Sequence, residues 1–179
     1  LREEMAQQMW SLAPDDDAAD MYLEGMAKLD TSGYHQYEIS NVAKPDRESR
    51  HNLKYWTDGE WLGFGCGAHS TRDGARWMNR SGTEDYIHAV KNRGLVQINT
   101  RKLTKEEQLE ETLFTGLRLA SGVDLDKTSH HYGVDVWAKF RNELQVFLDR
   151  GLLSYDQGCL KLTRNGMLLS HEVMRVFVG

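Results

Sequence analysis

An amphipathic helical pattern in the run VDVWAKFRNELQVFLDRG, residues 134–151, constrains the fold more than any other feature of the chain. Its apolar residues recur at helical spacing and share one face: Val136, Phe140, Leu144, Phe147 and Leu148. Gly151 comes three positions after Leu148 and is typical of a helix end. The pattern predicts one helix that ends before this glycine.

The elements around this helix predict a winged-helix-like domain over residues 101–179. Thr104 and Glu107 form a capping-box pattern before a stripe of apolar residues at Leu109, Leu113, Leu117 and Ala120. The run LDKTSHHYG predicts a short helix between the two longer ones. LLSYDQGCLKLT predicts two short strands, and RNGMLLSHEVMRVFV predicts a last helix. Three helices followed by a hairpin is the winged-helix order.

The first half of the chain, residues 1–100, mixes helix and strand patterns. PDDDAADMYLEGMAKLDTSG predicts a helix, and YHQYEISNVA predicts one strand after it, as in half of a βαβ unit. EWLGFGCGAHS reads as a glycine-rich strand, and TRDGARWMNR as a hairpin that turns at Asp73-Gly74. TEDYIHAVKNRG predicts a helix capped by Thr83. The opening run LREEMAQQMW is typical of the middle of a longer protein, so we expect a fragment.

Composition excludes several classes of protein. The net charge of -5 gives no general attraction to nucleic acid or to an anionic membrane. Cys66 and Cys159 are the only cysteines and have no CxxC spacing, which argues against a disulfide framework or a structural zinc site. The sequence contains neither a signal peptide nor an apolar run of membrane-spanning length. We therefore expect a cytoplasmic globular protein.

Three histidines of the first half, His35, His51 and His69, are expected at strand ends or in loops, where binding residues concentrate. No H-x-H or H-x3-H spacing joins them, so the pattern does not favour a metal triad. The best helix of the second half mixes basic and acidic side chains and presents no basic face for nucleic acid.

His51 stands out because of its neighbours in the run ESRHNLKYW. Tyr55 and Trp56 supply flat rings, and an axial histidine beside aromatic walls is a haem environment. In the other interpretation Trp56 and Trp61 are core anchors, Asn52 satisfies a loop backbone, and His51 is solvated. Spacing alone leaves both interpretations open.

The glycine-rich run also allows two interpretations. Its bare backbone is suited to an adenine or ribose bound by main-chain groups, although the run lacks a G-x-G-x-x-G register. Glycines there are equally expected where a curved sheet packs closely. Cys66, flanked by glycines, is expected to be a small buried hydrophobe.

Four motifs, YEISNVAKP, RHNLKYW, GFGCGAHS and LFTGLRLASGVDL, occur in this order over nearly the whole chain. Together they resemble the C-terminal portion of the radical S-adenosylmethionine proteins related to oxygen-independent coproporphyrinogen III oxidase. Within that family HNLKYW is similar to the HNxxYW motif of the haem chaperone branch, HemW.

The resemblance implies a fold, cofactors and site residues. The fold would be α/β plus α+β: the C-terminal part of a radical S-adenosylmethionine (β/α) partial barrel over residues 1–100, followed by the family's small winged-helix-like helical domain over residues 101–179. Haem would contact His51, as ligand of the iron, together with Asn52, Tyr55 and Trp56. The backbone of Gly63, Gly65, Gly67 and Ala68 would lie near S-adenosylmethionine. The family's C-x3-C-x2-C loop for a [4Fe-4S] cluster is absent, so this chain alone cannot carry out the radical chemistry.

The resemblance implies that the longer protein binds haem and delivers it to a haem-dependent client, and any peripheral membrane contact would come through that client. The alternative is a coproporphyrinogen III dehydrogenase of porphyrin biosynthesis, which also binds a tetrapyrrole. A third hypothesis, a winged-helix module that binds nucleic acid, conflicts with the acidic composition.

Overall fold

The computed structural model describes residues 14–57 and 59–178, so the run LREEMAQQMW lies outside the described residues. The chain divides into two compact units, Leu1–Glu48 and Ser49–Gly179. This division differs from the boundary predicted near residue 100, which stays a prediction. Each unit is described by itself.

The first unit contains the predicted helix, α2 (Asp15–Thr31). Pro14 precedes it, and three aspartates in its first turn suit the positive end of the helix dipole. Gly33 lies just beyond the end with a φ of 78°, a left-handed conformation that glycine adopts without strain. The predicted start and end of this helix are confirmed.

The predicted single strand that follows α2 is wrong, because these residues form an antiparallel hairpin of β1 (His35–Glu38) and β2 (Asn41–Ala43). Glu38 is fully buried, and its Oε1 accepts hydrogen bonds from the Ser40 amide at 3.0 Å and from the Asn41 side chain. These two bonds stabilise a reversal between the strands, which an alternation of apolar residues does not reveal.

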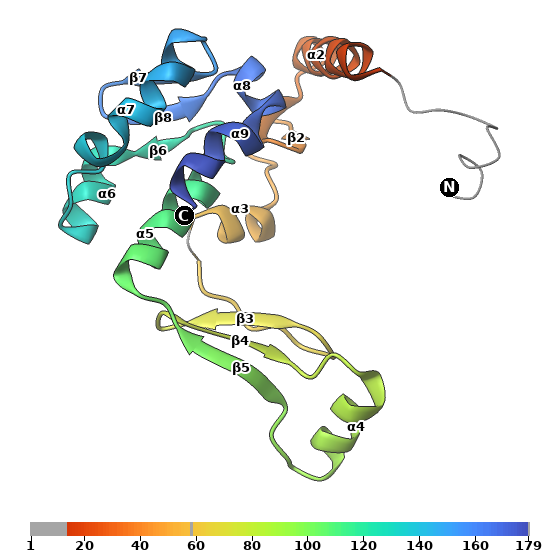
Figure 1. Ribbon diagram of the computed structural model, residues 1–179. Helices are drawn as coiled ribbons and strands as arrows, with labels where there is room; N and C mark the ends of the chain where they lie inside the picture. Colours follow the sequence, from red (N-terminus) through yellow and green to blue (C-terminus); the bar gives the residue numbers. More distant parts are fainter. Residues whose placement is uncertain (1–13, 58, 179) are drawn as a thin grey trace. The chain divides into compact units, whose positions relative to one another are not determined.

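The second unit begins with the short helix α3 (Arg50–Trp56) and continues into a three-stranded antiparallel sheet. Its strands, in the order β3-β4-β5, have these bounds: β3 (His69–Arg72), β4 (Ala75–Asn79) and β5 (Gln97–Lys102). The predicted turn is confirmed, since Asp73 and Gly74 both have a positive φ between β3 and β4. Helix α4 (Thr83–Lys91) connects β4 to β5 at one end of the sheet (Figure 1). It begins after Gly82, so the Thr83 cap is wrong.

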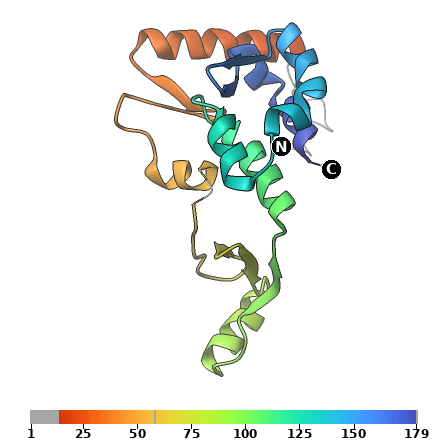
Figure 2. The same cartoon turned by 90° about the vertical axis from the view of Figure 1, so that its left-hand side faces the viewer.

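The rest of the second unit has the predicted order of three helices and a hairpin. The helices are α5 (Lys105–Gly116), α6 (Leu125–Tyr132) and α7 (Val136–Asp149). The hairpin strands are β7 (Leu153–Asp156) and β8 (Cys159–Leu162), and β6 (Val123–Asp124) extends their sheet in the order β6-β8-β7. Figure 2 shows this sheet beside the helices. The predicted last helix is wrong, because it is broken into α8 (Arg164–Leu168), α9 (Ser170–Met174) and the 3-10 turn η1 (Arg175–Phe177).

The core of the second unit lies among these helices and the small sheet. Its largest fully buried side chains include Leu113, Leu117, Leu125, Val136, Leu144, Leu160, Val173 and Phe177. Phe140 of α7 packs edge-on against Phe177, with ring centroids 5.0 Å apart. Phe147 and Leu148 are only half-buried, so the predicted apolar face of α7 is narrower than the sequence pattern.

The predicted capping box at the start of α5 is confirmed. Thr104 accepts a hydrogen bond from the Glu107 amide, and the Glu107 carboxylate accepts one from the Thr104 amide at 2.7 Å. A further hydrogen bond to Glu107 comes from Arg101. The Thr104 amide and the Arg101 guanidinium hold the pKa of Glu107 below its usual value of 4.5.

We predict that Glu107→Gln lowers stability at neutral pH but not in acid. Because the folded chain has the lower pKa, the Glu107 contribution is present above about pH 4.5 and is lost as pH falls through the folded pKa. Glutamine can still cap the helix but does not titrate in this range. Urea unfolding of the unmodified chain and of Glu107→Gln should show that the difference between their free energies of unfolding shrinks from pH 7 to pH 3. A difference that persists unchanged at pH 3 would contradict the prediction.

Candidate functional site

Helix α3 presents the residues of the HNLKYW motif. It starts because the Ser49 hydroxyl accepts a hydrogen bond from the Asn52 amide at 3.3 Å, as an N-cap does. His51 and Tyr55 are four residues apart and therefore lie on one helix face. The expected loop position of His51 is wrong: a Ser N-cap places it in the first turn of a helix.

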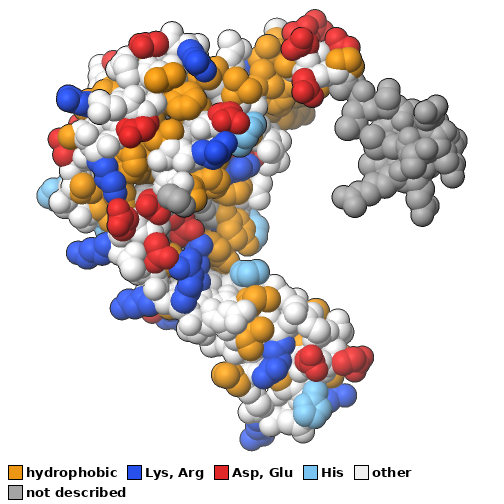
Figure 3. All heavy atoms as spheres, in the orientation of Figure 1, with side chains coloured by type: hydrophobic (Ala, Val, Ile, Leu, Met, Phe, Trp, Pro, Cys, Tyr) orange, Lys and Arg blue, Asp and Glu red, His pale blue; other side chains and the backbone are white. Residues whose placement is uncertain are grey.

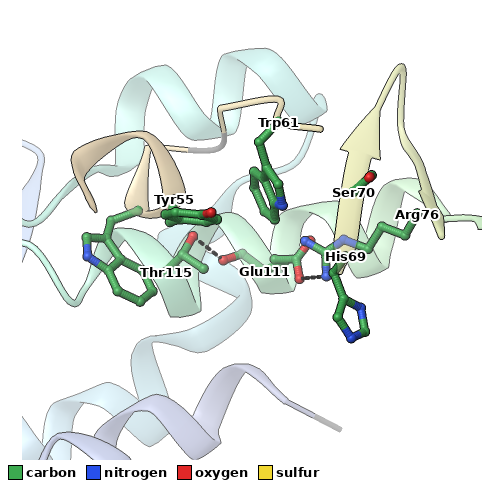
Figure 4. A pocket seen from close by; sticks show the side chains of 8 residues that line it. Tyr55, Trp61, His69, Ser70, Arg76, Glu111 and Thr115 are labelled. Atoms are coloured by element: carbon green, nitrogen blue, oxygen red, sulfur yellow. Dashed lines mark hydrogen bonds and ion pairs between the residues drawn. The ribbon is translucent and has the colours of Figure 1, made fainter. Parts of the chain in front are cut away.

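A cavity of about 350 Å³ opens beside this helix. Its lining residues come from α3, the sheet strands β3 and β4, helix α5 and the segment before β3: Tyr55, Trp56, Trp61, His69, Ser70, Arg76, Glu111 and Thr115. Figure 4 shows Tyr55 and Trp61 on one side of it, with the Arg76 side chain reaching toward Glu111. Its volume lies at the lower end of the range of small-molecule sites.

Aromatic rings form a continuous wall at this cavity. The Tyr55 and Trp61 ring centroids are 4.6 Å apart at an interplanar angle of 60°. The His51 ring meets Tyr55 edge-on, with centroids 5.0 Å apart. His51 is exposed and does not itself line the cavity, so Tyr55 connects the two. Trp56 is half-buried under the Arg118 guanidinium, which lies 4.2 Å from its ring centroid.

The opposite side of the cavity is polar. Arg76 Nη1 lies 2.5 Å from Glu111 Oε1, and these side chains are 33% and 24% exposed. The Thr115 hydroxyl donates to the Glu111 carbonyl oxygen at 2.7 Å, one turn earlier in α5. Two buried N–H donors of lining residues, Arg76 Nε and Trp56 Nε1, have no acceptor among the described residues. An unsatisfied buried donor costs about 1–3 kcal/mol.

The sequence motifs identified only part of this lining. Tyr55 and Trp56 belong to a predicted site, and the structure brings them together with Trp61, His69 and Arg76. The sequence reasoning missed Arg76 and Glu111 altogether, since they lie 35 positions apart in different elements. No sequence signal pairs them, because an arginine near a turn and a glutamate on a helix are ordinary surface residues until the structure shows them half-buried.

The glycine run does not form the predicted strand, because its main-chain groups bond irregularly. Asn79 Nδ2 donates to the carbonyl oxygens of Gly63 and Gly65, at 3.2 and 2.9 Å, and the Gly63 amide donates to Ser70 Oγ. A Cβ at Gly63 would collide with the His69 carbonyl, so close packing requires this glycine. Gly67 and Ala68 follow in the same irregular segment. Cys66 is exposed, which corrects the expectation of a buried hydrophobe.

The described residues give little support for a metal site, a nucleic-acid surface or a membrane-spanning helix. No group of three or more His, Cys, Asp or Glu side chains within the described residues is arranged to hold a metal ion. Basic and acidic side chains are interspersed over the second unit on the face drawn in Figure 3. No helix in the described part of the chain is long and apolar enough to cross a membrane.

Comparisons with known proteins place these observations in a family. The model of the HemN C-terminal domain matches residues 103–169. The heme chaperone HemW of Bacillus subtilis is 38% identical over 168 residues, which cover 94% of this chain and 44% of that protein. HemW of Lactococcus lactis is 32% identical over a match that covers 93% of this chain and 44% of that protein. This chain therefore spans less than half the length of these relatives.

Two further relatives widen the comparison. The mouse mitochondrial radical S-adenosyl methionine domain-containing protein 1 is 36% identical over 90% of this chain and 39% of its own length. The structure of coproporphyrinogen III oxidase (HemN) from Escherichia coli, a radical SAM enzyme, superposes with a TM-score of 0.71 at 20% identity. It covers 88% of this chain and 40% of HemN. The likeness confirms the predicted fold class, the C-terminal part of that radical SAM fold.

Proposed function

This chain belongs to the HemW/HemN-like radical SAM family as a C-terminal portion, and from that premise we propose that it carries the haem-binding part of a haem chaperone. The observation that carries the proposal is the HNLKYW helix, which joins an exposed histidine to an aromatic cavity through Tyr55. In the proposal haem is cargo, bound here and passed to a haem-dependent client protein.

The residues present suit haem. The flat rings of Tyr55, Trp56 and Trp61 match the apolar faces of a porphyrin. His51 would supply an axial nitrogen to the iron, and Asn52 beside it would help to hold the ligand. The imidazole is exposed, which suits a cargo that must enter from solvent and leave again.

The other cofactors of the family concern the longer protein. Cys66 and Cys159 cannot supply the three thiolates of a [4Fe-4S] loop, so we propose that cluster ligands lie outside this sequence. S-adenosylmethionine would lie near the backbone of Gly63 to Ala68 in the complete protein. We further propose a cytoplasmic location.

The alternative, a coproporphyrinogen III dehydrogenase, is favoured by the structural likeness to HemN and fits the match to the HemN C-terminal domain. That likeness concerns the fold, whereas the relatives at 32–38% identity carry the name heme chaperone. Direct binding of nucleic acid has no support in the mixed charges of the second unit.

A haem titration tests the proposal. Ferric haem added to the purified chain should give a saturable change in the Soret band, with about one haem per chain. Haem should then move from the loaded chain to an apo-haem protein such as apomyoglobin. A chain that leaves the Soret spectrum of free haem unchanged would sink the proposal, and protoporphyrinogen formation by the longer protein would favour the dehydrogenase.

A further inference from the structure

We propose that the cavity contains a carboxylate-binding site centred on Arg76 and that it holds one propionate of the bound porphyrin. The inference rests on the proposed function, because it specifies how the same cargo is recognised. It adds a residue, Arg76, that lies outside the HNLKYW motif and on a different element, β4.

The guanidinium of Arg76 is only partly used within the chain. Its Nη1 bonds to Glu111, while its Nε–H is buried and has no acceptor among the described residues. A guanidinium presents N–H groups in a rigid fork that matches the two oxygens of a carboxylate. About a third of the Arg76 side chain is exposed (33%), and Figure 4 shows it extended along the cavity toward Glu111, so a ligand in the cavity would meet the exposed part of the guanidinium rather than the buried Nε.

The surroundings of Arg76 favour a ligand that is flat and acidic. Tyr55, Trp56 and Trp61 offer a mainly apolar wall, and Arg76 is the one arginine or lysine among the lining residues of the described chain. Glu111 neutralises part of its charge, so the cavity would reject a simple anion that cannot also contact the rings. A porphyrin that carries a propionate can contact the aromatic rings through its macrocycle and Arg76 through its carboxylate. An inorganic anion can contact only Arg76, and an uncharged aromatic can contact only the rings.

Glu111 also influences how tightly Arg76 can bind a carboxylate ligand. It competes with any carboxylate ligand for the same guanidinium, because both are anions that accept hydrogen bonds from Arg76. Replacing Glu111 with glutamine should leave Arg76 with its full positive charge. Binding of an acidic porphyrin should therefore become tighter, while binding of an uncharged porphyrin should not change.

The test compares two iron-free probes, protoporphyrin IX and its dimethyl ester, because neither depends on a bond between iron and His51. Porphyrin fluorescence during titration with the 179-residue chain gives the Kd values of both probes. The chain should bind the acid about 10-fold more tightly than the ester, as expected for one hydrogen bond to a charged group. Arg76→Gln should bring the two values within about 2-fold of each other.

Arg101→Gln is the matched control, since Arg101 also pairs with a glutamate of α5 but does not line this cavity. It should keep the preference for the acid. If Arg76→Gln does not fold, as judged by circular dichroism, Glu111→Gln decides: it should increase the preference for the acid severalfold.

The outcomes separate the two proposals. Equal binding of acid and ester by the unmodified chain, or a preference that survives in Arg76→Gln, overturns the propionate site even if haem binds. A preference for the acid that depends on Arg76 supports the site even if haem gives no Soret change. Failure to bind either probe overturns the propionate site as well.

Discussion

Replacing His51 with alanine should abolish the Soret change of the haem titration. An imidazole nitrogen bonded to iron alters the electronic spectrum of the porphyrin directly, and alanine has no atom that can replace it. The aromatic wall stays in place, because His51 contacts Tyr55 only at its edge. Weak binding through the rings could remain, so the spectrum rather than the affinity alone is the decisive measurement.

A matched control is His131→Ala. His131 is also an exposed histidine on a short helix, and its ring meets Tyr132 edge-on with centroids 4.6 Å apart. This variant should titrate like the unmodified chain. Added imidazole should restore a Soret change to His51→Ala, which a merely structural role of His51 would not predict. An unaltered Soret change in His51→Ala would rule out its assignment as iron ligand.

Gly166→Ala should destabilise the second unit by about 3 kcal/mol or more, an effect at the upper end of those from overpacking. A Cβ at this position would overlap the carbonyl oxygen of Leu152. That oxygen accepts a hydrogen bond from the Thr163 amide, and Thr163 caps helix α8 at Gly166. A backbone group held in this way cannot move aside as the end of a flexible side chain can.

Gly133→Ala provides the comparison for this effect. Gly133 ends helix α6 with a φ of 70°, and a Cβ there meets no atom within 4 Å. Its replacement should cost only about 1–2 kcal/mol, the strain of a left-handed alanine. Urea unfolding followed by circular dichroism measures both variants. Equal losses of stability would show that the Leu152 carbonyl does not restrict residue 166.

The helices were predictable where their signals are local. The capping box at Thr104, the aspartates in the first turn of α2 and the apolar spacing in α7 act within a few residues, so the sequence displays them directly. The turn at Asp73-Gly74 is local in the same way. These elements formed as predicted.

One error arose where a partner distant in the sequence decides the conformation. The glycine run failed as a strand because Asn79 and Ser70 bond its main chain in an irregular path. The break in the last helix has a different cause. Leu169 has a φ of -104° and a ψ of 24°, outside the helical range, and so separates α8 from α9.

The residues of the candidate site also fall into two groups: those that one local motif predicts and those that only the folded structure brings together. A single motif predicted His51, Asn52, Tyr55 and Trp56, because the four candidate side chains lie within one turn and a half of a helix. Their role in haem binding stays a prediction, as does the role of the Gly63 to Ala68 backbone. Arg76 and Glu111 could not be paired from sequence, since side chains on β4 and α5 meet only once the sheet and the helix have packed.

The sequence by itself therefore determined the family, the local elements of the second half and the motif that marks the site. Only the tertiary structure decided that this motif lies beside a cavity, that Trp61 completes its wall, and that a buried Arg76 N–H faces no acceptor. The physical reason is the distance along the chain over which the deciding interactions act. Caps, turns and helical stripes depend on neighbours in the chain, whereas a cavity and its unsatisfied donors depend on surfaces brought together by packing.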